Sequence, residues 1–349
     1  MGLLNDNKIK HEQKNLGAPD VSVLMAVRNE EKNLGELLDQ LKHQDYPEDK
    51  YEIIVVNDRS TDSTGAIISE QCGRDKRINC ITIDRVPTGW APKKWALNSA
   101  VEASNGEILL FTDGDCSVEK SWITTMISSF YDKKVGMVAG PSPLESTSSG
   151  ILGDMLLLDS MAQDALAAGA ISRGIPLSCS GRNLAIRRKA FEAVGGYNDT
   201  KDILSGDDDL FIAEASTKTN TAISLNKASF TTSLPKTSLK AWFHQKRRHI
   251  TTAKRYSFKV KTILAGFYIS QLLFWLFCIS LLIIQPYSIV VISLFLVREF
   301  IQGFILYKTF KTLHESALLL IFPLLEILLL SVQACLFITN IVSKPKSWD

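Results

Sequence analysis

Apolar segments of strand length alternate with amphipathic helical segments through the first third of this 349-residue chain. Strands are expected at 21–27, 51–57, 78–83 and 108–112, with helices at 30–43 and 93–103 between them. This alternation predicts an α/β fold with a mostly parallel sheet. Further along, the pattern indicates an edge strand at 135–139, a long helix at 151–168 and a short helix at 189–194.

Acidic residues follow two of the expected strands directly. The strand from Tyr51 runs into Asp58, and the strand from Ile108 runs into Asp113-Gly114-Asp115. Ligands of open α/β sheets bind beyond the carboxyl ends of the strands. A third acidic group, Gly206-Asp207-Asp208-Asp209, comes later in the chain. We therefore expect the three groups to surround one site for a nucleotide and a divalent ion.

Each acidic group suits a different part of such a site. Asp113 and Asp115 offer the hard oxygen ligands that Mg²⁺ or Mn²⁺ takes together with substrate phosphates, and the ion would neutralise charge on a departing diphosphate. Asp58 would accept hydrogen bonds from a nucleobase or ribose; its alternative role is to cap the next helix. Lys93, at a helix start, would reach a phosphate unless it is simply solvated there.

The Asp207–Asp209 cluster supplies a candidate general base. Crowded carboxylates resist full ionisation, which raises one pKa toward a useful range. The alternative interpretation is an exposed acidic turn whose repulsion is relieved by solvent.

The last third of the chain changes character abruptly. Residues 227–261 contain ten Lys or Arg and no Asp or Glu, and an uncharged apolar segment of 22 residues follows at Ile263–Ile284. That length spans a bilayer core of about 30 Å as a helix. Ala317–Val342 is a second candidate, and Ile289–Tyr307 a weaker third because it contains Arg298 and Glu299. The middle segment is either a span or an interfacial helix.

An Arg inside a bilayer costs about 2.5–3.5 kcal/mol and needs a partner. If neighbouring segments run antiparallel, Arg298 and Glu326 lie at one depth, and we expect them to pair. Basic residues near short loops remain on the cytoplasmic side, which places residues 227–261 inside and Gln285-Pro286-Tyr287 outside. Three spans would put the tail from Ser343 outside, although Lys344 and Lys346 argue against that. The basic run favours anionic lipid over nucleic acid.

The six cysteines show neither metal-ligand spacing nor a secreted disulfide framework, so we expect a reducing, cytoplasmic environment for them. No cleavable signal is visible in Met1–Pro19. An amphipathic helix is expected around Gln245-Lys246-Arg247-Arg248-His249, where Gln245 and Arg248 share a face and would hold an acceptor or a diphosphate. In the alternative interpretation, Arg247 and Arg248 only face lipid.

Taken together, these motifs resemble the family 2 glycosyltransferases with a GT-A fold, including membrane-bound relatives that glucosylate lipids or polymerise sugars. The resemblance covers residues 21–255. It rests on the segments Val21–Glu30, Val56–Asp62, Lys93–Asn98, Asp113–Asp115, Ser180–Asn183 and Val194–Tyr197. By this resemblance the donor site contains Ala26, Arg28, Asn29, Glu30, Asp58, Lys93 and Asp113. The acceptor or diphosphate side contains Gly181, Asn183, Gln245, Arg248 and His249, and the metal ligands are Asp113 and Asp115.

Three positions depart from the family pattern. Pro92 stands where the family carries Gly before its Lys, and His249 stands where the membrane-bound relatives carry Trp, although Trp242 lies nearby. The family's Glu-Asp base motif is replaced by the triple Asp, so the catalytic base is Asp207 or Asp208. We favour Asp207, because Asp209-Leu210 then occupies the position of a frequent Asp-Leu pair.

The sequence thus predicts a GT-A domain followed by transmembrane helices at the cell membrane, with the catalytic domain cytoplasmic. We expect a flexible segment at 1–19, the catalytic domain at 20–235, an interfacial helix at 236–261, about three membrane helices at 262–343 and a tail at 344–349. The expected reaction is inverting transfer from a nucleotide-diphospho-sugar, with uridine as nucleoside by resemblance, to a lipid hydroxyl, using Mg²⁺ or Mn²⁺. The alternatives are a processive polysaccharide synthase, a nucleotidyltransferase and a membrane scaffold without catalysis.

Overall fold

The computed structural model describes residues 17–145, 150–175, 178–215, 220–284, 288–313 and 321–343. The chain forms two compact units. The first comprises Met1–Glu145, Leu166–Leu234 and Ser347–Asp349; the second comprises Ser146–Ala165 and Pro235–Lys346. The expectations for residues 1–16, Gln285–Tyr287, Lys344 and Lys346 lie outside the described residues.

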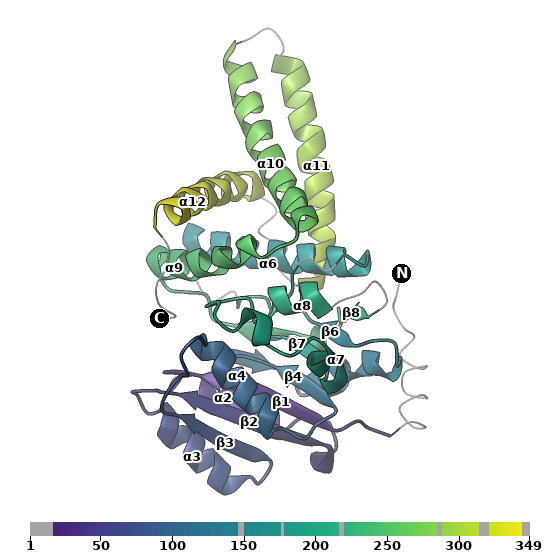
Figure 1. Ribbon diagram of the computed structural model, residues 1–349. Coiled ribbons are helices and arrows are strands. Elements are labelled where there is room, and N and C mark those ends of the chain that lie inside the picture. Colours follow the sequence, from purple (N-terminus) through teal and green to yellow (C-terminus); the bar gives the residue numbers. More distant parts are fainter. Residues whose placement is uncertain are drawn as a thin grey trace. The chain divides into compact units, whose positions relative to one another are not determined.

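Within the described residues, the first unit is built on a seven-stranded sheet in the order β3-β2-β1-β4-β7-β6-β8 (Figure 1). Its strands are β1 (Val21–Val27), β2 (Tyr51–Asp58), β3 (Ile78–Ile83), β4 (Ile108–Phe111), β6 (Met137–Ala139), β7 (Leu184–Arg187) and β8 (Thr221–Ile223). Strands β1 to β4 are parallel, whereas β7 runs antiparallel to both β4 and β6. The predicted α/β class with a mostly parallel sheet is confirmed.

The short strands are where the structure differs from the prediction. We expected an edge strand at 135–139, but β6 is an inner strand, because β8 pairs with it in parallel on its outer side. Strands of three or four residues give too few alternating positions to be recognised, so β7 and β8 were not predicted. A separate two-stranded sheet pairs β5 (Cys116–Val118) with β9 (Thr231–Ser233).

Both faces of the seven-stranded sheet are covered by helices. All seven residues of β1 are buried, as expected for the centre of a parallel sheet. Val23 and Met25 pack in one core with residues of α2 (Leu34–Lys42), α3 (Thr64–Arg74) and α5 (Trp122–Ile127). Leu24 and Ala26 pack on the opposite face, in a core with residues of α4 (Pro92–Ala103), α6 (Ile151–Ser172), α7 (Arg188–Ala193) and α8 (Asp209–Ala215).

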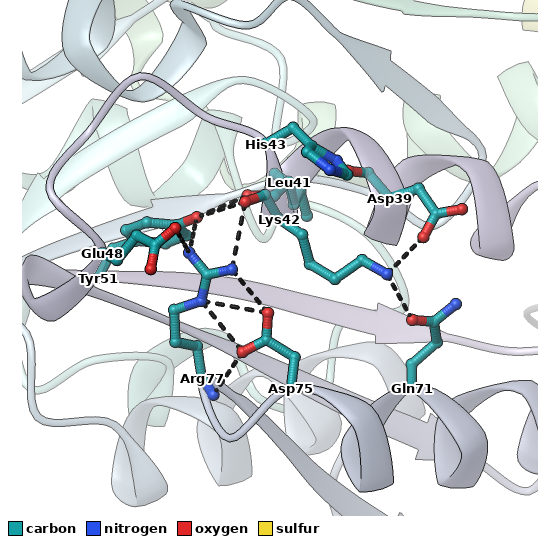
Figure 2. A network of polar contacts seen from close by, with 9 residues as sticks. All are labelled: Asp39, Leu41, Lys42, His43, Glu48, Tyr51, Gln71, Asp75 and Arg77. Carbon is teal, nitrogen blue, oxygen red and sulfur yellow. Dashed lines mark hydrogen bonds and ion pairs between the residues drawn. The ribbon is translucent and has the colours of Figure 1, made fainter.

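A polar network secures the beginnings of β2 and β3 (Figure 2). The Arg77 guanidinium donates to the Tyr51 hydroxyl at 2.5 Å, to the Lys42 carbonyl at 3.2 Å and to the Asp75 carboxylate at 2.6 Å. The hydrogen bond from Arg77 lowers the pKa of Asp75. One side chain therefore joins α2, β2 and the turn before β3.

The cysteines differ from the expectation in one respect. Cys72 in α3 and Cys80 in β3 form a disulfide, whereas Cys116, Cys179, Cys278 and Cys335 are free. The sequence showed no disulfide framework, so this pair was not predicted. Helix α3 leads into β3 through a short turn and packs beside it, which brings the two side chains together although their spacing matches no motif.

The second unit contains four helices in its described C-terminal part: α9 (Leu239–Ile250), α10 (Phe258–Ile284), α11 (Ser288–Leu313) and α12 (Phe322–Val342). Helices α10 and α11 run side by side, and α12 lies at a steep angle to them (Figure 1). Among the described residues, α10 and α12 are long and apolar enough to cross a membrane by length and composition.

The predicted pair between Arg298 and Glu326 is confirmed. The Arg298 guanidinium donates to both carboxylate oxygens of Glu326, at 2.7 and 2.9 Å. It also pairs with Glu299 at 2.8 Å and lies 4.0 Å from the centre of the Phe274 ring. Trp275 donates its ring N–H to Glu326 at 2.9 Å. The charged side chains of α11 and α12 thus contact one another and Trp275 of α10.

Candidate active site

The carboxyl ends of three parallel strands meet at one edge of the sheet. Val27 at the end of β1 pairs with Asn57 near the end of β2, and Leu24 pairs with Phe111 at the end of β4. Because β7 is antiparallel, its first residue Leu184 pairs with Phe111 at the same edge. The loops after β1, β2 and β4 and the loop before β7 therefore converge, as the acidic motifs predicted.

Lys93 is at the centre of the acidic groups. Its ammonium nitrogen lies 2.9 Å from Asp113 Oδ1 and 3.0 Å from Asp207 Oδ2. Burial opposes the charge of Lys93, but attraction to Asp113 and Asp207 outweighs it and raises the pKa of Lys93. Burial likewise opposes the charge of Asp207, and attraction to Lys93 outweighs it and lowers the pKa of Asp207. Two carboxylates far apart in sequence thus share one cation.

Lys93 is placed there by the start of α4. Pro92 occupies the first helical turn, where its missing N–H needs no partner and its fixed φ suits the helix. The Pro at this position therefore fits the local structure. Lys94, the next residue, turns away: it is 1% exposed and its ammonium donates to the Thr200 carbonyl at 2.7 Å. Burial lowers the pKa of Lys94 to about 8.

Gly114 allows the Asp113–Asp115 loop to pack against β1. A Cβ at Gly114 would lie 2.6 Å from Val27 Cγ1 and 3.3 Å from Glu30 Cγ. No larger residue fits without movement, so the loop is held against the end of β1 and beside the predicted donor residue Glu30. Asp113 and Asp115 remain partly exposed on either side of the glycine.

Asp208 contacts the backbone, unlike its neighbour Asp207. Its Oδ2 accepts the Gly181 N–H at 2.8 Å, and its Oδ1 accepts the Asp209 N–H at 2.7 Å, at the start of α8. Burial and repulsion from Asp207 and Asp209 raise the pKa of Asp208 to about 8. The adjacent acids therefore shift in opposite directions, because only Asp207 touches a cation directly. Gly181 lies against both of them, since a Cβ there would be 3.4 Å or less from each.

Asp58 lies at the predicted edge but is fully buried. Its carboxylate accepts hydrogen bonds from Arg59 Nε at 2.7 Å and from Arg59 Nη2 at 3.2 Å. Arg59 adopts a φ of 54°, a left-handed conformation that is uncommon for a residue with a side chain. The Arg59 guanidinium therefore covers the carboxylate that was expected to face the nucleobase. The sequence reasoning missed Arg59, although a basic residue directly after a strand-ending Asp was a visible signal.

The loops after β1 and β2 are tied together by polar contacts. Asn29, also left-handed at a φ of 56°, accepts the Thr61 N–H at 2.8 Å, and the Glu30 N–H donates to Thr64 Oγ1 at 2.8 Å. Arg28 is half-buried in the same loop. Ala26 is 6% exposed and belongs to the apolar core. Ala26 is therefore a core residue of β1, whereas Arg28, Asn29 and Glu30 lie in the loop that follows this strand.

Asn183 has a structural role in this arrangement. It is fully buried, its side-chain oxygen accepts the Trp122 ring N–H at 3.0 Å, and its amide donates to the carbonyls of Pro141 and Ser229. Every polar atom of this side chain has a protein partner and the side chain is buried, so Asn183 holds parts of the fold together, in contrast to the acceptor role that the resemblance implied.

Gln245, Arg248 and His249 lie on α9 in the second unit, as the amphipathic pattern predicted. Two of their neighbours bind other helices of that unit. Lys246 pairs with Asp159 of α6 at 2.5 Å, and Arg247 donates to Asn340 of α12 at 2.9 Å. Arg247 is therefore a helix–helix contact and does not simply face lipid.

The carboxylates of Asp113 and Asp115 fit a divalent ion that takes only some of its ligands from the protein. Within the described residues, no group of three or more His, Cys, Asp or Glu is arranged as a metal site. The lysine ammonium already bound to Asp113 shows that a cation is stabilised at this position. Next to it, the buried Thr112 hydroxyl has no hydrogen-bond partner. Two carboxylates completed by substrate phosphates are the usual protein contribution to a Mg²⁺ or Mn²⁺ site.

Comparison with known proteins agrees with this geometry. The family described as "Glycosyl transferase family 2" matches residues 22–195. "Probable glycosyltransferase YdaM" of Bacillus subtilis (strain 168) is 32% identical over 183 residues, which cover 52% of this chain and 43% of YdaM. The "Beta-monoglucosyldiacylglycerol synthase" of Nostoc sp. (strain PCC 7120 / SAG 25.82 / UTEX 2576) is 28% identical over 197 residues, which cover 54% of this chain and 41% of that protein. The chain thus spans about two-fifths of the length of these relatives.

One solved structure shares the fold across nearly the whole chain. The mannosyltransferase PcManGT from Pyrobaculum calidifontis, in complex with GDP-Man and Mn²⁺, superposes with a TM-score of 0.55 at 21% identity. The superposition covers 91% of this chain and 92% of that one. The matched sequence segment contains β1 to β4 with the Asp113-Gly114-Asp115 motif. The chain belongs to glycosyl transferase family 2 and has the GT-A fold.

Proposed function

We propose that this protein is an inverting glycosyltransferase that moves a sugar from a nucleotide-diphospho-sugar to the hydroxyl of a lipid at the membrane. The observation that carries the proposal is the Lys93 ammonium shared by Asp113 and Asp207. It brings the proposed ion and diphosphate site to the proposed general base. Uridine is the proposed nucleoside by family resemblance.

The reaction needs three functions from these residues. Asp207 accepts the proton of the acceptor hydroxyl, whose oxygen then bonds to the anomeric carbon from the face opposite the leaving group. The bond between that carbon and the diphosphate oxygen breaks, and its electron pair leaves with the nucleoside diphosphate. Asp113 and Asp115 would hold a divalent ion, which would neutralise the charge of the diphosphate. Lys93 binds the diphosphate as a second positive charge.

The base assignment rests on what each acid touches, and not on the pKa, which is raised at Asp208 and lowered at Asp207 by its contact with Lys93. Asp207 points to Lys93 and therefore to the donor side, whereas both oxygens of Asp208 accept backbone N–H groups. Asp208 thus positions Gly181 and the start of α8. The Asp58–Arg59 pair forms the nucleoside end of the site, with Arg59 as the outer group.

The second unit supports a lipid acceptor. Its apolar helices follow directly on the basic helix α9, which suits an anionic membrane surface. A relative named for a diacylglycerol product is 28% identical over 197 residues, which cover 54% of this chain. We propose that Gln245, Arg248 and His249 act on the acceptor side, that α10 to α12 attach the protein to the cell membrane, and that the catalytic unit is cytoplasmic.

Purified protein in lipid vesicles, incubated with labelled nucleotide sugars and Mn²⁺, tests the proposal. We expect one donor to give a labelled, organic-extractable glycolipid together with free nucleoside diphosphate. Asp207→Asn and Asp115→Asn should each abolish labelling, whereas Lys189→Gln, a charge loss at an exposed position of α7, should not. A labelled product that grows in length and partitions into water would favour a processive synthase instead. Absence of transfer from every donor would contradict the proposal.

A further inference from the structure

The proposed ion site contains a cation that belongs to the protein itself. Lys93 contacts Oδ1 of Asp113, the first acid of the motif that would hold a divalent ion. The same ammonium contacts Asp207, and Asp208 lies close enough to add to the attraction. The three acids that face Lys93 are thus neutralised in part before any ligand arrives.

An ammonium and a divalent ion cannot both contact the same carboxylate oxygen from the same direction. The ammonium at 2.9 Å occupies the space in front of Asp113 Oδ1, and its positive charge repels a second cation at that position. Repulsion is strong here because the Lys93 side chain is only 18% exposed and water screens it little. Binding of an ion to Asp113 Oδ1 must therefore displace Lys93 from that oxygen.

The diphosphate of the donor changes this balance. It brings the oxygen ligands that two protein carboxylates cannot supply. It also offers the Lys93 ammonium another anion on a flexible four-carbon side chain. The neighbouring Lys94 cannot replace Lys93, either in the free protein or with a diphosphate bound, because its ammonium is buried against the Thr200 carbonyl.

We propose that Lys93 is a tethered counter-cation that holds the acids together in the free protein and yields Asp113 to the divalent ion only when a diphosphate is present. The ion and the nucleotide then bind cooperatively, and neither the free ion nor the free nucleotide fills the site well alone. This inference rests on the proposed function, since it assumes that the donor carries a diphosphate.

Manganese titrations of the full-length protein in detergent, followed by electron paramagnetic resonance of free Mn²⁺, test the inference without any turnover. For the unaltered protein, we expect weak Mn²⁺ binding alone and binding tighter by on the order of 5–100-fold with saturating UDP. Lys93→Gln and Lys93→Met should bind Mn²⁺ alone more tightly than the unaltered protein. The increase in Mn²⁺ affinity on addition of UDP should be smaller in these variants. Lys93→Arg, which keeps a cation, should stay close to the unaltered protein, and Lys189→Gln should match it.

The outcomes separate the two ideas. Equal Mn²⁺ affinity with and without UDP in the unaltered protein would overturn the inference, and so would unchanged or weaker Mn²⁺ binding in folded Lys93→Gln and Lys93→Met. Thermal unfolding checks that each variant is folded, and the comparison within the unaltered protein needs no variant. Failure to bind Mn²⁺ even with UDP would instead contradict the metal ion in the proposed function.

Discussion

Arg298 in α11 and Glu326 in α12 form a two-pronged ion pair, with both carboxylate oxygens within 2.9 Å of the guanidinium. Each belongs to a helix made mostly of apolar residues, where a lone charge is costly. Glu326 is 8% exposed, so its partner largely replaces solvent. The pair therefore joins α11 to α12.

Removal of one partner should be far more damaging than removal of both. We expect Arg298→Met to lower the unfolding free energy by about 3–5 kcal/mol, because it leaves the buried Glu326 carboxylate without its charged partner. Arg298→Met combined with Glu326→Leu should recover much of that loss. Unfolding in detergent micelles measures the four corners of the cycle, and strictly additive effects would contradict the pairing.

Substitution of the two adjacent acids should separate chemistry from support. Asp207→Asn should reduce kcat by on the order of 10²–10⁴-fold, because the proposed general base is lost. Asp208→Asn keeps an oxygen for only one of the two backbone N–H groups and should act mainly through the Gly181 loop. Steady-state kinetics with the identified donor would show a larger loss of kcat in Asp207→Asn. The reverse order would move the base to Asp208.

Asp208 should also make the protein less stable at high pH. Its folded-state pKa of about 8 lies above the ordinary value of 3.8. The folded protein therefore holds this proton more tightly than the unfolded chain, so the contribution is complete at low pH and is lost as pH rises through about 8. Asp208→Asn should raise Tm relative to the unaltered protein more at pH 9 than at pH 5. Equal differences at both pH values, measured by differential scanning fluorimetry, would contradict the shift.

The Asp75–Arg77 pair should have the opposite dependence on pH. The folded-state pKa of Asp75 is lowered, so its stabilising contribution is present at neutral pH and is lost as pH falls below about 4 and through the folded value. Arg77→Ala should lower Tm more at pH 7 than at pH 3; its hydrogen bonds to Tyr51 and the Lys42 carbonyl do not depend on this titration. Arg74→Ala is the matched control, since Arg74 pairs with Glu70 on the surface, where such pairs contribute about 0–1 kcal/mol.

The end of α12 should be on the same side of the membrane as α9. Arg247 of α9 donates to the side chains of Asn340 and Ser343, and Asn340 donates back to the Arg247 carbonyl. Helix α9 follows the catalytic unit before any apolar helix, so this contact predicts a cytoplasmic Ser343, whereas three spans predicted an external one. Ser343→Cys, made together with Cys335→Ser, should resist impermeant thiol reagents in intact cells and react after lysis. Labelling in intact cells would favour three spans.

The sequence predicted β1 to β4, because these strands are apolar and alternate with helical segments. Val21–Val27 and Ile78–Ile83 have the bounds that were expected. In the other half of the sheet, β6 was expected as an edge strand at 135–139 but is an inner strand, and the short strands β7 and β8 were not predicted. Tertiary packing, not local preference, determines where such short segments pair.

The same division applies to the site. Asp113 was named from its position after a strand, and Asp207 from the acidic cluster and the family resemblance; the fold brings both to one lysine. The roles of Asp58 and Asn183 could not be read from the sequence, because burial under Arg59 and saturation by Trp122, Pro141 and Ser229 depend on distant parts of the chain. A motif identifies which residue type stands at a position, whereas the contacts of that side chain in the fold determine whether it faces a ligand.

The reversal of direction at β7 separates the site into two halves with different origins. The proposed nucleotide side is built by strand ends from the first 115 residues, and the proposed acceptor side by segments that follow β6. Insertions or exchanges in the later segments can change the proposed acceptor side while the register of β1, β2 and β4 stays intact. Evolution toward a new recipient, or its deliberate redesign, can therefore work on the later half alone and leave the sugar-delivering half unchanged.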